Sequence, residues 1–134
     1  MTKSTSNHKP TILLILLIVG WIVTLLIESS QPPLPILGEV HGLDKAVHFL
    51  AFGGLGLLVC TLSFKLRPKP AIPLLSFPLL IVTLFGVIEE SYQVLVPGRT
   101  ADLLDLLADV SGALFAIILA NRVAHLIRPN KENI

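Results

Sequence analysis

Three aspartates in the last third of the chain have a spacing that would let them take part together in proton transfer. Asp102, Asp105 and Asp109 stand at positions i, i+3 and i+7, which places their carboxyls on one face of a helix. At a rise of about 1.5 Å per residue, Asp109 lies roughly 10 Å further along that helix than Asp102. Carboxyls at that spacing can donate or accept protons in general acid or base catalysis.

A second group of polar residues surrounds His48. Asp44 and Lys45 precede it by four and three residues, so all three could converge on one side of a helix. For Asp44 alone, a helix N-cap is the favoured interpretation, because its carboxylate can accept hydrogen bonds from free amides. His48 is either an interfacial hydrogen-bonding residue or an acid-base catalyst, and the nearby carboxylates make these interpretations about equal.

A third group precedes the aspartates. Glu89 and Gln93 stand at i and i+4 and can face one partner, whereas Glu90 is expected to face water. For Arg99, an ion pair with Glu89 or Asp102 is the default interpretation. The alternative is that its planar guanidinium holds a phosphate or carboxylate of a ligand.

The composition excludes an ordinary soluble protein. Of the 134 residues, 53% are hydrophobic and 14% are charged, where soluble domains have about 25% charged residues. A net charge of +1 gives no broad basic surface, so no nucleic acid partner is expected. The single cysteine, Cys60, excludes an intrachain disulfide and a zinc site made of thiolates.

Four apolar runs are expected to form an all-helical bundle in the lipid bilayer. The first is retained rather than cleaved as a signal peptide, since no A-x-A-like site follows it. Prolines in the third are expected to kink it, and the proline-rich connection Gln31 to Gly42 is expected to be extended. The four runs are Thr11 to Ile27, Ala46 to Phe64, Ala71 to Ile88 and Leu103 to Ala120.

The distribution of charge orients these runs. Eight of the 10 Lys and Arg residues fall in the N-terminal tail, the connection between the second and third runs, and the C-terminal tail. The positive-inside rule then makes residues 1–10 and 121–134 cytoplasmic tails of a four-helix domain at 11–120. All acids except Glu132 fall on the opposite, outer side. The expected location is the bacterial cytoplasmic (inner) membrane, crossed several times.

Small residues recur along the fourth run, at Ala108, Gly112, Ala116 and Ala120. Small residues at every fourth position let two helices approach closely. We therefore interpret these four as packing residues and expect their face, which carries the aspartates, to be turned towards protein.

The motifs in chain order resemble the VanZ-like family of small bacterial integral membrane proteins. The matching positions are Asp44-Lys45-x-x-His48-Phe49-x-x-Phe52, Glu89-x-x-x-Gln93, and Pro97-Gly98-Arg99-x-x-Asp102-x-x-Asp105-x-x-x-Asp109-x-x-Gly112. The resemblance implies a four-helix membrane protein and a link, in founding members, to low-level resistance to the glycopeptide teicoplanin. The family pattern usually has Asn where this chain has Asp109, and a carboxyl buried there would be favoured in its neutral form.

Two hypotheses follow from these residues. In the first, an outer pocket binds or modifies an envelope lipid or a peptidoglycan-related molecule. His48 with Asp105 or Glu89 would transfer protons, and Lys45 and Arg99 would hold an anionic head group. The remaining ligand-binding residues would be Asp44, Gln93, Asp102 and Asp109.

In the second hypothesis, the polar groups only fix helix packing, and the protein is a structural or accessory component. Proton- or ion-coupled transport is the weakest reading, because no ionisable residue is expected in the inner half of the membrane. No cofactor and no metal site are predicted, since the spacing of His41, His48 and the carboxylates does not support one.

Overall fold

The computed structural model describes residues 8–66 and 76–127, and these residues form helices without any strand. The helices are α1 (Lys9–Ser29), α2 (Pro35–Glu39), α3 (Leu43–Leu66), α4 (Ser76–Gln93) and α5 (Leu103–Ile127). The expectation of an all-helical protein is confirmed.

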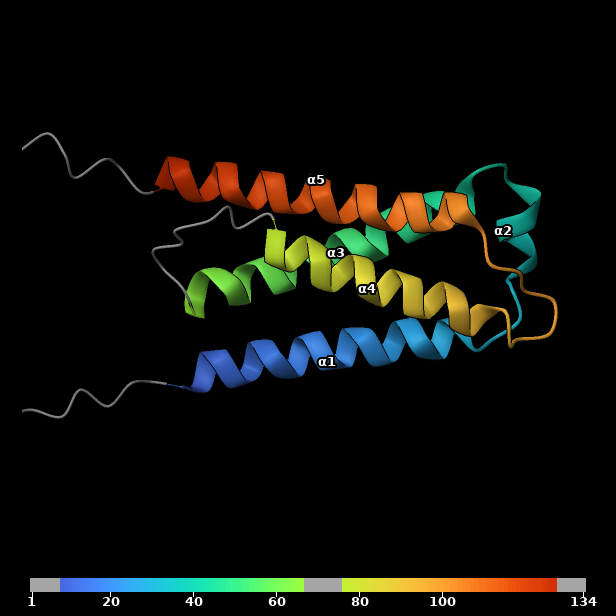
Figure 1. Ribbon diagram of the computed structural model, residues 1–134, viewed down its shortest axis with the longest axis horizontal. Coiled ribbons are helices and arrows are strands. Elements are labelled where there is room, and N and C mark those ends of the chain that lie inside the picture. The colour runs from blue at the N-terminus through green and yellow to red at the C-terminus, as the bar shows by residue number, and fades with distance from the viewer. Residues whose placement is uncertain (1–7, 67–75, 128–134) are drawn as a thin grey trace, which may run out of the picture.

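The four long helices extend along the long axis of the molecule (Figure 1). The described chain starts and finishes at one end of this bundle, where α1 begins and α5 ends. The short helix α2 lies at the opposite end, together with the connection between α4 and α5 (Figure 1). The polar residues singled out in the sequence belong to that opposite end.

Helices α3 and α5 form the most extensive interface of the bundle, and glycine makes it possible. A Cβ on Gly112 would collide with the backbone carbonyl of Phe49, whose Cα would lie 2.9 Å away. A Cβ on Gly56 would come within 3.0 Å of the Cα of Ala113. The close approach expected from the small residues of the last helix is therefore confirmed at Gly112, and the partner is α3.

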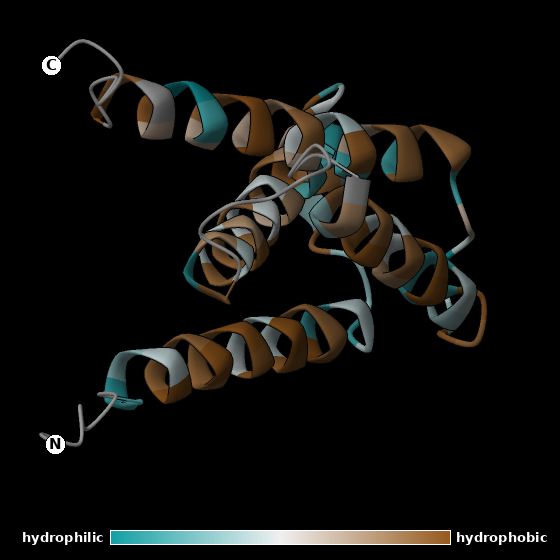
Figure 2. Cartoon of the chain, turned by 60° about the vertical axis from the view of Figure 1, so that its left-hand side comes forward, coloured by the Kyte–Doolittle hydropathy of each residue, from teal (hydrophilic) through white to brown (hydrophobic). Residues whose placement is uncertain are grey.

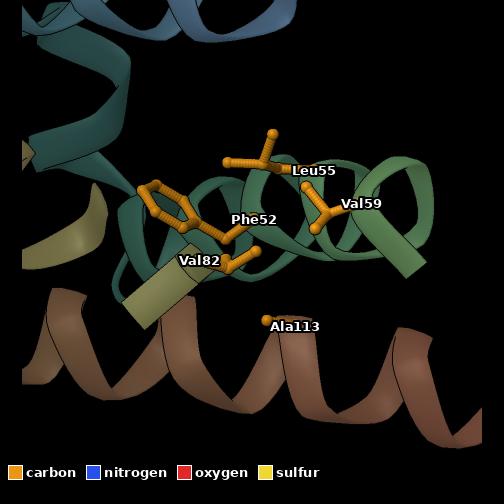
Figure 3. Close-up of a cluster of buried hydrophobic side chains, with 5 residues drawn as sticks. All are labelled: Phe52, Leu55, Val59, Val82 and Ala113. Atoms are coloured by element: carbon orange, nitrogen blue, oxygen red, sulfur yellow. The ribbon is translucent and has the colours of Figure 1, made fainter. Parts of the chain in front are cut away.

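An apolar core fills the space between α3, α4 and α5 (Figure 3). The side chains of Phe52, Leu55 and Val59 repeat at helical spacing on α3 and contact Val82 and Ala113. Each of the five is less than a tenth exposed, and Val82 and Ala113 are fully buried. This cluster fixes the positions of the three helices that carry the polar residues.

Helix α1 lies at the side of the bundle and packs against α3 and α4. Trp21 attaches it, because its indole N–H donates a 3.0 Å hydrogen bond to the carbonyl of Ala51, and its ring lies against Gly54. Most of the large apolar side chains of α1 remain exposed, and hydrophobic residues predominate along this helix (Figure 2). Such a surface suits a lipid environment.

Within residues 8–66 and 76–127, three helices are long and apolar enough to cross a membrane: Lys9–Ser29, Leu43–Leu66 and Leu103–Ala124. Helix α4 is not among them; its 18 residues include Glu89, Glu90 and Gln93 in the last two turns. The run expected from Ala71 starts outside the described residues.

The connection between the first two spans differs from the expected extended segment. Residues Pro35–Glu39 form α2, with proline at its start, where a missing N–H costs nothing. The chain then turns at Gly42, whose φ of +76° favours glycine. A short helix and a turn therefore replace the expected extended segment, and α2 packs against α3.

Candidate functional site

The first polar group centres on Lys45, in the first turn of α3. Its Nζ lies 2.8 Å from Asp44 Oδ2, 2.5 Å from Asp102 Oδ2 and 2.8 Å from Asp105 Oδ1. The predicted shared face of Asp102 and Asp105 is thus confirmed, because both meet one ammonium group. The hydrogen bond from Lys45 also holds the pKa of Asp102 below its usual range.

Asp102 has a second role as the N-cap of α5. Its Oδ1 accepts a 2.8 Å hydrogen bond from the N–H of Leu104, and its carbonyl accepts the N–H groups of Asp105 and Leu106. One carboxylate therefore starts the helix and binds the lysine of a neighbouring helix. For Asp44 the capping interpretation is wrong, since α3 begins before it at Leu43.

The second polar group lies one turn deeper and is buried. His48 Nδ1 lies 2.9 Å from Asp109 Oδ1 and 3.9 Å from Glu89 Oε2. Asp109 is completely buried, while Glu89 and Glu90 are 4% and 6% exposed. Asp109, the third aspartate of the pattern, therefore meets the histidine of α3, as its place on the same helix face requires. Of Asp44, Lys45 and His48, which could converge on one side of a helix, the first two bind each other, while His48 binds Asp109.

Polar side chains from α1 and α4 hold Glu89 in place. Gln93 donates a 2.9 Å hydrogen bond from Nε2 to Glu89 Oε1, as their i, i+4 spacing suggested. The hydroxyl of Ser29 donates to the same oxygen. Ser29 was not predicted as a site residue, although two consecutive serines, Ser29 and Ser30, follow one residue after the first apolar run.

Glu90 does not face water, so that prediction is wrong. Its Oε2 accepts a 3.0 Å hydrogen bond from the backbone N–H of Asp102. Glu90 therefore binds the backbone immediately before α5. Helical periodicity could not predict this contact, because it shows only which residues share a face of one helix. The partner of Glu90 is a backbone N–H in the loop before α5.

In the part of the chain that the structure describes, three buried carboxylate oxygens have no hydrogen-bond partner: Glu89 Oε2, Glu90 Oε1 and Asp109 Oδ2. His48, Glu89, Glu90 and Asp109 each offer one donor atom, and these four atoms lie within 4.8 Å of one another. Such unpaired acceptors are costly inside a protein. The arrangement can share protons or bind a cation.

Arg99 does not form the expected ion pair. Its Nε donates to the carbonyl of Gln31 at 2.8 Å, and its Nη2 donates to the carbonyl of Glu28 at 3.2 Å. Among the described residues no carboxylate lies within ion-pair distance of it. Its guanidinium instead joins the loop before α5 to the end of α1.

A pocket of about 540 Å³ opens over both polar groups. Its lining combines apolar side chains with the polar side chains of the site. The apolar residues are Leu25, Pro33, Leu34, Leu37, Val47, Ala51 and Phe52. The polar residues include Glu28, Ser29, Asp44, His48, Glu89, Gln93, Arg99, Thr100, Asp102 and Asp105.

The predicted site residues therefore fall into one region. Seven of the nine line the pocket. Lys45 binds three of these seven, Asp44, Asp102 and Asp105, and Asp109 binds a fourth, His48. His41 is exposed and takes no part in the buried group.

Comparison with known proteins identifies a family. The family model described as VanZ/LLP1 matches residues 3–126, nearly the whole chain. No curated protein matches. No solved structure matches either.

Proposed function

Because the chain belongs to the VanZ-like family, we propose that it is a multi-pass protein of the bacterial inner membrane whose outer pocket binds an envelope lipid. In this proposal α4 is a fourth span, and both chain ends lie in the cytoplasm. Two features support it. The start of α1 and the end of α5 lie at one end of the bundle (Figure 1). Lys9, Lys65 and Arg122 belong to the helix segments at that end, and five further Lys and Arg residues follow or precede those segments in the sequence.

The mixed lining of the pocket, with apolar and polar side chains together, is the observation that carries the proposal. Leu34, Leu37 and Val47 offer apolar surface to an acyl or isoprenoid chain, while Glu28 and Gln93 offer hydrogen-bonding groups. Binding pockets with mostly apolar walls and a few converging polar groups suit amphipathic ligands.

The charges favour a head group rich in hydroxyls. Lys45 is already bound to three carboxylates, so it has little capacity left for an anion. Carboxylates accept hydrogen bonds from hydroxyl groups, and Arg99 is the remaining cation of the pocket wall. A sugar-bearing lipid, such as a peptidoglycan-related one, fits this set. A catalytic role would fall to His48, with Glu89 or Asp105 as its partner.

Filling the pocket tests this proposal without touching the polar groups. Val47 lines the pocket and is 45% exposed, whereas Leu50 on the same helix is 71% exposed and lies outside it. The protein is purified in nanodiscs formed with a polar lipid extract of bacterial envelopes, and co-isolated lipids are identified by native mass spectrometry. We expect Val47→Trp to lose a lipid that wild type and Leu50→Trp retain. Equal lipid profiles in all three would contradict the proposal.

A second candidate function is structural, and the well-satisfied Lys45 group favours it. Here the polar residues fix helix packing for a partner complex. Complementing a deletion strain with His48→Ala separates the candidates, if lipid composition, glycopeptide susceptibility and membrane abundance are measured together. Normal abundance with an altered lipid profile supports the pocket; reduced abundance with no lipid change supports the structural role.

A further inference from the structure

The buried acids behind the pocket outnumber the cations available to them. Glu89, Glu90 and Asp109 are at most 6% exposed, and Lys45, one turn before His48 on α3, is bound to three other carboxylates. A proton on His48 would balance one of the three charges. Buried charges that lack partners are strongly unfavourable, so this group requires further protons or a bound cation.

The unpaired oxygens favour the cation. Glu89 Oε2, Glu90 Oε1 and Asp109 Oδ2 are all buried without a hydrogen-bond partner. A proton shared between carboxyls would place a hydrogen bond on at least one of these atoms. An ion between the side chains satisfies several of them at once.

The four donor atoms lie close enough together to reach one ion. Metal–ligand distances of about 2.0 to 2.2 Å place two donors of the same ion about 3 to 4.4 Å apart. His48 Nδ1 is 2.9 Å from Asp109 Oδ1 and 3.9 Å from Glu89 Oε2. One donor atom from each of the four residues lies within 4.8 Å of the others, so small side-chain movements suffice.

Neighbouring groups fix the orientation of the side chains that would bind the ion. Gln93 and Ser29 donate to the other oxygen of Glu89, and the N–H of Asp102 donates to the other oxygen of Glu90. The ring of Phe52 stacks on His48 with centroids 6.3 Å apart. Hydrogen bonds to the far side of metal ligands are the usual support of a metal site.

We propose that His48, Glu89, Glu90 and Asp109 form a binding site for one divalent first-row metal ion, such as Zn²⁺ or Mn²⁺. One imidazole and three carboxylates suit these ions better than Ca²⁺, which takes oxygen ligands, or Cu⁺, which takes sulfur. His48 and Glu89 also line the pocket, which gives the ion a path of entry. The site goes beyond lipid binding and does not depend on it.

Metal uptake by the full-length protein tests this. Protein in detergent is stripped with a chelator and dialysed against Zn²⁺ or Mn²⁺, and bound metal is measured by mass spectrometry against a detergent blank. We expect one ion per chain in wild type, and affinity at least about tenfold lower in His48→Ala and Glu90→Gln. Glu39→Gln makes the same chemical change at an exposed glutamate of α2 and should bind as wild type.

A measurement on wild type alone keeps the test decisive if a variant fails to fold. Co²⁺ bound through a histidine nitrogen gives visible ligand-field bands, which Zn²⁺ should displace. Absence of these bands together with no uptake above the blank would overturn the proposal, as would unchanged affinity in folded His48→Ala and Glu90→Gln. Loss of lipid binding in Val47→Trp with metal uptake retained would separate this site from the proposed function.

Discussion

Lys45 is the residue on which the outer end of the bundle most depends. It has 27% of its side chain exposed and meets three carboxylates, of which Asp105 is 11% exposed. Partly buried ion pairs contribute more than surface pairs, because water screens them less. Removing the lysine would leave three carboxylates to repel one another across α3 and α5.

We expect Lys45→Met to lower the free energy of unfolding by about 1 to 3 kcal/mol, since it leaves charged groups without their partner. Thermal unfolding in detergent, followed by circular dichroism, measures this. Lys65→Met is the matched control, because Lys65 is exposed in the last turn of the same helix. A similar shift in both variants would count against the role given to Lys45.

At the scale of elements, backbone approach decides the packing of α3 on α5. Gly112 lies so close to the carbonyl of Phe49 that no side chain fits between the helices. Gly20 on α1 differs, since a Cβ there would meet nothing within 4 Å. The same substitution should therefore have opposite effects at these two positions.

Gly112→Ala should destabilise the protein by about 1 to 3 kcal/mol, because the added methyl group forces the helices apart. Gly20→Ala should stabilise it by about 0.5 to 1 kcal/mol, because alanine has the higher helix propensity and finds open space. Unfolding temperatures of both variants in the same detergent check the prediction. Equal signs for the two shifts would contradict it.

For the whole molecule, the proposed orientation predicts which segments meet the outside of the cell. Thr100 lies in the exposed loop before α5, and Ser6 belongs to the N-terminal tail. The native cysteine, Cys60, is fully buried, and Cys60→Ala gives a background without thiols. The positive-inside rule then assigns the two positions to opposite sides.

In that background, Thr100→Cys should react with a membrane-impermeant maleimide in intact spheroplasts, whereas Ser6→Cys should react only after lysis. Four spans with both ends inside require this pattern. If Ser6→Cys is labelled in intact spheroplasts as strongly as Thr100→Cys, the orientation or the number of spans is wrong.

Much of the fold could be predicted, because apolar run length and small-residue spacing are local properties of the sequence. The runs correspond to α1, α3, α4 and α5, and the aspartate spacing correctly places Asp102 and Asp105 on one face. Helix α2 was missed, since five residues after a proline carry no periodic signal.

The pairing of the polar groups could not be predicted in the same way. Sequence spacing relates residues of one helix, whereas the partners of His48, Glu90 and Arg99 come from other elements. Which carboxylate meets which cation depends on how α3, α4 and α5 are rotated about their axes. Close backbone contacts, such as the one at Gly112, set that rotation.

The hydrogen bonds of Arg99 have a consequence for sequence variation among relatives. Its guanidinium binds the carbonyls of Glu28 and Gln31, which every amino acid supplies. Positions 28 and 31 can therefore change identity without loss of this contact, whereas position 99 requires a side chain with a forked donor. In an alignment, variable residues at the end of α1 should accompany a constant arginine before α5.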